Sequence, residues 1–97
     1  MQQKRINLYN KAFSKWGDRA QHDMAVEECA EFVMAMKKLY RAKTEEDKAK
    51  RLENIREEIA DVMIMMEQMA VLFGIDQVKE NKKMKLDRLE KRLNIVK

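Results

Sequence analysis

The chain has no proline, only two glycines and one cysteine among its 97 residues. Without the residues that most often interrupt helices, and with 39% charged residues, it is expected to be all-α. One cysteine excludes an internal disulfide, and the first residues lack the apolar segment of a signal peptide, so a cytoplasmic location is expected. No apolar run reaches membrane-spanning length, so no membrane partner is expected.

Basic residues outnumber acidic ones, 21 to 17, giving a formal net charge of +4. They are spread over helix ends, a central linker and the last helix, without interleaved aromatic residues. This pattern does not favour a nucleic-acid partner, whereas a phosphate-bearing small molecule suits the same charge.

Apolar periodicity divides the chain into four helices of a single domain, residues 1–97. Gly17 suits the end of the first helix, and Asp18 with Gln21 resembles a capping box for a second helix that runs to about Ala42. The first helix repeats apolar or aromatic side chains at three- and four-residue steps: Ile6, Tyr9, Phe13 and Trp16.

The second half of the chain predicts two further helices. Thr44 is the expected N-cap of a helix that ends at Phe73, and Gly74 and Asp76 are expected to separate it from a basic fourth helix. The third helix has the seam of a helix bundle at Leu52, Ile55, Ile59, Val62, Met66, Met69 and Phe73, and the fourth carries Val78, Leu86, Leu89, Leu93 and Val96.

The third helix is apolar on more than one face. At 100° per residue, Met63 and Ile64 point away from the predicted seam, and Ile64 lies opposite Ile55. Because soluble proteins rarely expose large apolar patches, a second chain is expected to cover this side, giving a homodimer or homotetramer.

Two acidic clusters lie within apolar sequence that has no lysine or arginine. Glu27, Glu28 and Glu31 lie in the segment 24–36, and Glu57, Glu58 and Asp61 lie where the apolar segment 59–73 begins. Carboxylates packed among apolar side chains without a basic partner repel each other and lose hydration, so they need a proton or a cation. Acid-rich solvated helix faces are common, and such a face is the alternative interpretation.

The spacing of these acids predicts a metal site. Glu28 and Glu31 are three residues apart, as are Glu58 and Asp61, so each pair projects from one side of its helix. If the second and third helices pack antiparallel, the four carboxylates converge into an oxygen-rich site suited to Mg²⁺, with Mn²⁺ as an alternative. With one histidine and one cysteine in the chain, a zinc site is not expected.

These motifs, EECAE at 27–31 and EIAD at 58–61, resemble those of the MazG-like nucleoside triphosphate pyrophosphohydrolases of the all-α NTP pyrophosphatase superfamily. The segment FSKWGDRAQ before the first motif, the segment VMIMMEQMAVLFGI after the second and the lysine-rich last helix agree in order and spacing. The resemblance covers nearly the whole chain. Each motif is weak alone, and their ordered pair is more specific.

The resemblance implies Mg²⁺-dependent hydrolysis of NTPs or dNTPs between the α and β phosphorus, to a nucleoside monophosphate and pyrophosphate. It implies metal ligation by Glu28, Glu31, Glu58 and Asp61, with Glu27 as a catalytic residue or further ligand. Phosphate contacts are implied for Lys85, Arg88 and Arg92. Gln21 is expected either to cap its helix or to face the substrate.

Two alternatives stay open from the sequence. One is a phosphoribosyl-ATP or dUTP pyrophosphohydrolase, which belongs to the same superfamily and has similar acidic motifs. The other is a non-catalytic helical interaction module whose acids are only solvated. The intact set of five acids argues against this second alternative.

Overall fold

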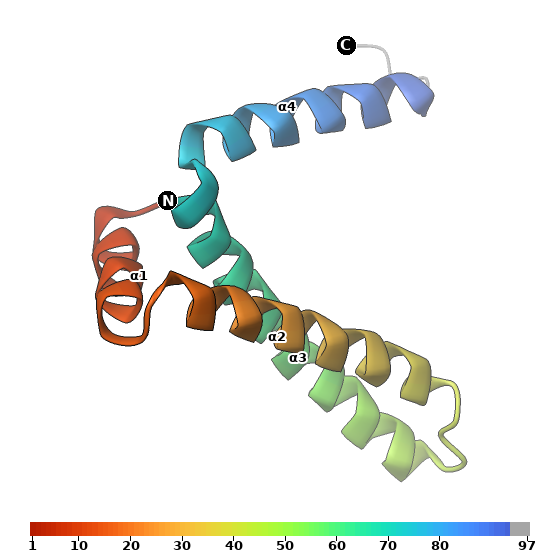
Figure 1. Ribbon diagram of the computed structural model, residues 1–97. Helices are drawn as coiled ribbons and strands as arrows, with labels where there is room; N and C mark the ends of the chain where they lie inside the picture. The colour runs from red at the N-terminus through yellow and green to blue at the C-terminus, as the bar shows by residue number, and fades with distance from the viewer. Residues whose placement is uncertain (94–97) are drawn as a thin grey trace.

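The computed structural model describes residues 1–93 and consists of four helices, which confirms the all-α prediction (Figure 1). The helices are α1 (Gln3–Trp16), α2 (Asp18–Leu39), α3 (Glu45–Phe73) and α4 (Ile75–Arg92). Within this part of the chain there is no strand, and no helix is long and apolar enough to cross a membrane.

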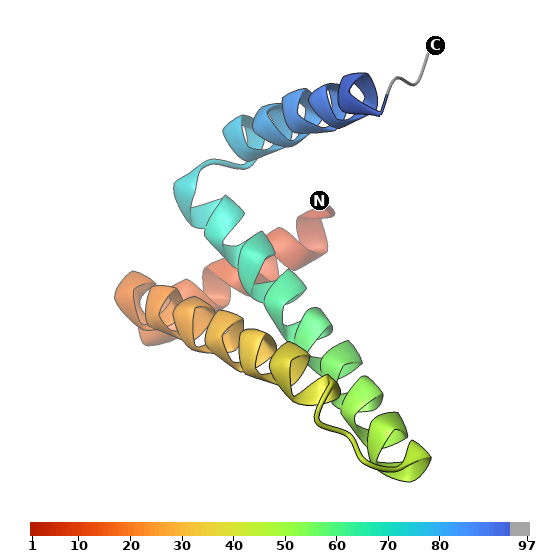
Figure 2. The same ribbon diagram turned by 90° about the vertical axis from the view of Figure 1, so that its right-hand side faces the viewer.

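The two long helices α2 and α3 form an antiparallel hairpin, and both acidic motifs lie on it (Figures 1 and 2). The turns on either side of this hairpin depend on glycine. Gly17 (φ 89°) and Gly74 (φ 121°) have positive φ, which other residues rarely adopt, and each donates its N–H to the last turn of the preceding helix. The predicted helix ends at these two glycines are confirmed.

The predicted caps have mixed outcomes. Thr44 caps α3, because its Oγ1 accepts the N–H of Asp47 at 3.0 Å. The capping box at Asp18 and Gln21 is wrong: Asp18 is already the first helical residue, and Gly17 takes the N-cap position. Asp76 is likewise inside the first turn of α4, where its charge favours the helix dipole without capping it.

The second helix ends at Leu39, three residues before the predicted Ala42, because residues 40–44 form the connection to α3. The predicted apolar position Val96 lies outside the described residues.

The predicted seam of α3 is only partly correct. Ile55 is buried, but Ile59, Met66 and Phe73 are exposed, whereas Met65 and Gln68 are buried instead. The reason is that α2 packs against a neighbouring face of α3. It presents two buried small residues there, Ala25 and Ala35, which allow close approach of the two helices.

The short helix α1 is fastened to α3 by one polar cluster. Tyr9 is buried and donates its hydroxyl hydrogen to Oε1 of Glu67 at 2.5 Å, and Arg5 pairs with Oε2 of Glu67 at 2.9 Å. Burial, followed by the hydrogen bond to Glu67, raises the pKa of Tyr9, so the phenol stays protonated and remains a donor.

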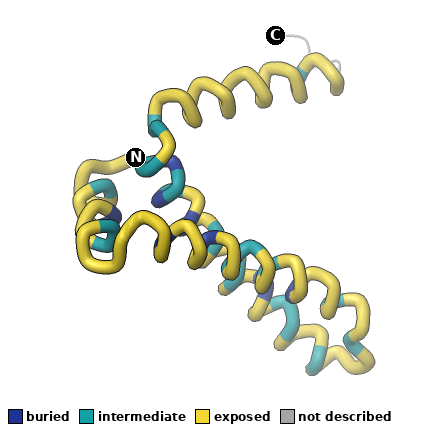
Figure 3. Tube along the Cα trace, viewed as in Figure 1, coloured by how far each residue is buried: buried dark blue, intermediate teal, exposed yellow. Residues whose placement is uncertain are grey.

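The fold leaves much apolar surface uncovered. The radius of gyration is 17.0 Å, whereas a compact domain of this length has about 12–13 Å. The helix α4 extends away from the hairpin and has no buried residue, and among residues 1–93 it touches only α3 (Figures 1 and 3). In the described part of the chain the buried apolar residues are few: Tyr9, Ala25, Ala35, Ile55, Met65 and Ala70.

Candidate functional site

Three of the predicted metal ligands come together where α2 packs on α3. Glu28 and Glu31 project from α2 and Glu58 from α3, and one carboxylate oxygen of each lies within 4.8 Å of the others. The i, i+3 spacing brings the two α2 acids to one side of the helix, and the antiparallel packing places Glu58 opposite them. We call Glu28, Glu31 and Glu58 the carboxylate cluster.

Two oxygens of this cluster lack a hydrogen-bond donor. Oε2 of Glu28 and Oε2 of Glu58 are buried, and neither accepts a hydrogen bond from residues 1–93. A buried carboxylate oxygen without a donor is unfavourable, and a cation bound between the helices would remove that penalty. The residues present therefore fit a hard divalent cation, which takes carboxylate oxygens and keeps some of its water.

The electrostatics of the cluster agree with this geometry. The pKa of Glu28 is raised above its ordinary value, first by desolvation and then by the negative charges of Glu31, Asp61, Glu58 and Glu27. The pKa of Glu58 is raised by desolvation and then by Glu31, Asp61 and Glu57. Since every named cause disfavours the ionised carboxylates, these two positions favour a proton or a cation.

The other predicted acids lie at the edge of the cluster. Asp61 is exposed and outside the group of three converging ligands, but close enough to raise the pKa of both Glu28 and Glu58. Glu27 is also exposed and acts on Glu28 in the same way. Both side chains are open to solvent. The role of Asp61 as a metal ligand and that of Glu27 as a catalytic residue remain predictions.

The predicted substrate contacts are not brought to the cluster within one chain. Lys85, Arg88 and Arg92 are exposed on α4, which touches only α3 in the described residues. Gln21 is buried at 6% exposure, about two turns before Glu28 on the same side of α2. Its position within the packed helices favours a structural role over the predicted contact with substrate.

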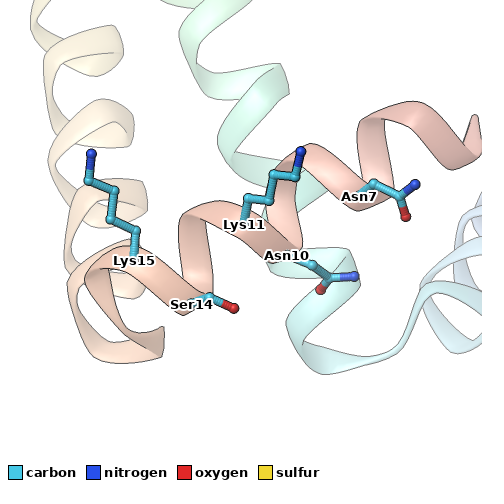
Figure 4. Close-up of a pocket in the computed structure, with 5 residues that line it drawn as sticks. All are labelled: Asn7, Asn10, Lys11, Ser14 and Lys15. Carbon is cyan, nitrogen blue, oxygen red and sulfur yellow. The ribbon is translucent and has the colours of Figure 1, made fainter.

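A hollow of about 420 Å³ lies on α1, away from these acids, and is lined by Asn7, Asn10, Lys11, Ser14 and Lys15. Figure 4 shows that all five side chains come from this one helix and spread in different directions. Because no second element faces them, they do not form an enclosed binding site.

An apolar surface that the sequence pattern alone does not predict lies on the side of the hairpin opposite the acids. Glu31 and Val33 are two residues apart and therefore project about 160° apart, and the same holds for Asp61 and Ile59. We call this surface the apolar face; it comprises Val26, Cys29, Val33 and Met36 of α2 and Ile59, Met66 and Phe73 of α3.

These residues repeat at the spacing of a helix-packing seam. Ile59, Met66 and Phe73 follow one another at seven-residue intervals, as do Val26 and Val33. Members of both helices line a shared hollow of about 370 Å³, and Phe73 is 65% exposed. The heptad spacing on α2 was the signal available in the sequence, but the three acidic residues between Val26 and Val33 obscured it.

Comparisons of the chain with models of known protein families, with curated proteins and with solved structures found no match.

Proposed function

We propose that this protein is a metal-dependent nucleoside triphosphate pyrophosphohydrolase. The observation that carries the proposal is the carboxylate cluster, with its two buried oxygens that accept no hydrogen bond from the described residues. Glu28 and Glu58 are half-buried and Glu31 is exposed, and acids whose pKa is raised by desolvation and like charges cluster at functional sites. The resemblance of the two acidic motifs to those of the MazG-like pyrophosphohydrolases suggests the reaction class.

In this proposal Glu28, Glu31 and Glu58 hold Mg²⁺ or Mn²⁺, and Asp61 joins them as a fourth ligand. The cation, when bound, neutralises phosphate oxygens and lowers the pKa of a bound water molecule. No histidine is then needed to activate that water. Glu27, exposed beside Glu28, orients the water or receives its proton.

The proposed reaction is hydrolysis at the α phosphorus. The oxygen of one water molecule bonds to this phosphorus, and the bond from it to the oxygen bridging to the β phosphorus breaks. The products are a nucleoside monophosphate and pyrophosphate, and the proton of the water passes through a carboxylate to solvent. A cluster half open to solvent suits this reaction, since substrate and water enter from one side.

Self-association is part of the proposal, because one chain buries too little apolar surface for a stable domain. A second hairpin laid against the apolar face would make a four-helix bundle with heptad packing, and it would leave the acids of both copies on outer sides. The α4 residues Lys85, Arg88 and Arg92 would have to come from another copy to contact phosphate at the cluster.

The test is an assay of pyrophosphate release from a panel of NTPs and dNTPs, including dUTP and phosphoribosyl-ATP, with Mg²⁺ and with EDTA. Release from at least one nucleotide, abolished by EDTA, supports the proposal. Inactivity on the whole panel by protein that is folded and loaded with metal would favour a helical interaction module instead.

A further inference from the structure

A cationic hollow lies at the loop end of the hairpin, where the sequence motifs predict no functional residue. Its volume is about 430 Å³, and the residues lining it include four cations, Lys38, Arg41, Lys50 and Arg51, and one carboxylate, Asp47. Lys38 belongs to α2, Lys50 and Arg51 to α3, and Arg41 to the connection between them. We call these four residues the cationic hollow.

The hollow lies on the same side of the hairpin as the carboxylate cluster. Lys38 follows Glu31 by seven residues, and Arg51 precedes Glu58 by seven residues. Seven residues are close to two helical turns, so each cation shares a face with its acid and lies about 10 Å further along the axis. Asn54, which also lines the hollow, is only one turn from Glu58.

One of the cations is held in place by the fold. Arg51 is half-buried, its Nε pairs with Oδ2 of Asp47 at 3.1 Å, and its NH1 donates to the backbone carbonyl of Lys38 at 2.6 Å. These contacts join α2 to α3 at the loop end and fix a guanidinium at the wall of the hollow. Asp47, the single carboxylate that lines the hollow, is therefore already paired with Arg51, and the net charge of the lining residues is positive.

Lys38, Arg41 and Lys50 surround this fixed group with exposed side chains. Lys50 has a contact of 3.9 Å with Glu46, with both side chains largely exposed, which is too weak to hold the ammonium group. Several long cationic side chains around one hollow form a site for a multiply charged anion, and arginine in particular matches phosphate oxygens.

We propose that the cationic hollow binds the β,γ-diphosphate end of the substrate while the α phosphorus lies at the carboxylate cluster. This inference rests on the proposed function and extends it, because it assigns the leaving group to residues of the same chain. The separation of about 10 Å is within the combined reach of a phosphate chain and extended Lys and Arg side chains. The cations on α4 are then not required for this contact.

Calorimetric titration of inorganic pyrophosphate into the protein in EDTA tests binding without any dependence on catalysis. The variant is the double substitution Arg41→Gln and Lys50→Gln, which removes two exposed cations and spares the Arg51 contacts. The matched control is Lys4→Gln with Lys11→Gln, which removes the same charge from exposed positions of α1. We expect roughly tenfold weaker binding in the hollow variant and a change below twofold in the control.

The same two variants are then assayed for nucleotide hydrolysis. We expect the hollow variant to raise KM several-fold with a much smaller effect on kcat, and the control to change neither. The inference is overturned if the wild type does not bind pyrophosphate, if both variants bind it equally, or if KM is unchanged in the hollow variant.

Failure of the proposed function would look different from failure of this inference. If no nucleotide is hydrolysed while pyrophosphate binding is lost only in the hollow variant, the anion site stands and the enzymatic proposal fails. If nucleotides are hydrolysed and the hollow variant behaves as wild type in both assays, the enzymatic proposal stands and the anion site fails. Glu28→Gln in EDTA should bind pyrophosphate at least as well as wild type, because it removes negative charge near the ligand.

Discussion

Glu28 on α2 and Glu58 on α3 face each other with carboxylate oxygens within 4.8 Å, and each has a buried oxygen that accepts no hydrogen bond from residues 1–93. The hairpin therefore packs around two acids that repel each other. This is a strain on the metal-free fold that a cation would relieve, and it has measurable consequences.

The first consequence is a pH dependence of stability without metal. The pKa values of Glu28 and Glu58 are raised in the folded protein, so the folded state keeps these protons at pH values where the unfolded chain has lost them. The stabilisation that these two bound protons provide is fully present below the ordinary glutamate pKa of 4.5. It is lost as pH rises from there through the raised pKa values of Glu28 and Glu58.

Thermal melts in EDTA across pH 4 to 8 measure this effect as the difference in melting temperature between wild type and Glu28→Gln. Taking the difference cancels the titration of the other carboxylates, which both proteins share. We expect the variant to become more stable relative to wild type as pH rises. A difference that is constant over the whole range would show that the two acids are not electrostatically strained.

The second prediction concerns cation binding. Free Mg²⁺ or Mn²⁺ at a hundredfold excess over its Kd stabilises the folded state by about 2.7 kcal/mol. For a chain of this size that raises Tm by about 10 °C or more. Glu28→Gln and Asp61→Asn should lose most of this shift.

The control for the cation experiment is Glu45→Gln, an exposed acid in the first turn of α3. It should lower the melting temperature slightly and keep the full Mg²⁺ shift. An equal shift in all three variants would mean that the cation binds elsewhere on the chain.

The third prediction concerns assembly through the apolar face. Val33→Glu places a charge on this face and should dissociate the oligomer, as measured by light scattering, with a lower melting temperature. Met34→Glu is the matched control: Met34 is next in sequence and similarly exposed, at 46% against 50%, but it points about 100° away. A wild type that is monomeric at assay concentration, or equal effects of both substitutions, would contradict this assignment.

The fourth prediction concerns the attachment of α1. Tyr9→Phe removes the hydrogen bond to Glu67 and should lower the free energy of unfolding by about 1 kcal/mol. Tyr40→Phe is the natural control, because Tyr40 is 91% exposed. Chemical denaturation of both variants measures the difference, and equal stabilities would show that the Tyr9 contact does not hold α1 in place.

The four helices could be predicted from the sequence, because the two glycines with positive φ and the Thr44 cap are local signals of helix ends. The sequence was not sufficient to predict the seam of α3, because Ile59 and Met65 are both apolar, and only the packing of the helices against α3 decides which of them is buried. The Asp18 and Asp76 caps failed for a related reason: an acid in the first turn and an acid at the N-cap look alike in sequence.

The candidate site was predictable where it depended on helical spacing. The i, i+3 pairs brought Glu28, Glu31 and Glu58 together as expected, and left Asp61 at the edge. The cationic hollow was not predictable in the same way, because Lys38 and Arg51 meet only once α2 and α3 are paired in their observed register. The link from Tyr9 to Glu67 spans 58 residues and has no local signal.

Phosphorus NMR of a nucleoside triphosphate incubated with the protein and Mg²⁺ is the decisive test of the proposed pyrophosphohydrolase activity, because it distinguishes attack at the α phosphorus from attack at the γ phosphorus. We expect monophosphate and pyrophosphate to appear in equal amounts with wild type and neither to appear with Glu28→Gln. Accumulation of diphosphate and orthophosphate, or an undiminished yield of pyrophosphate with Glu28→Gln, would contradict it.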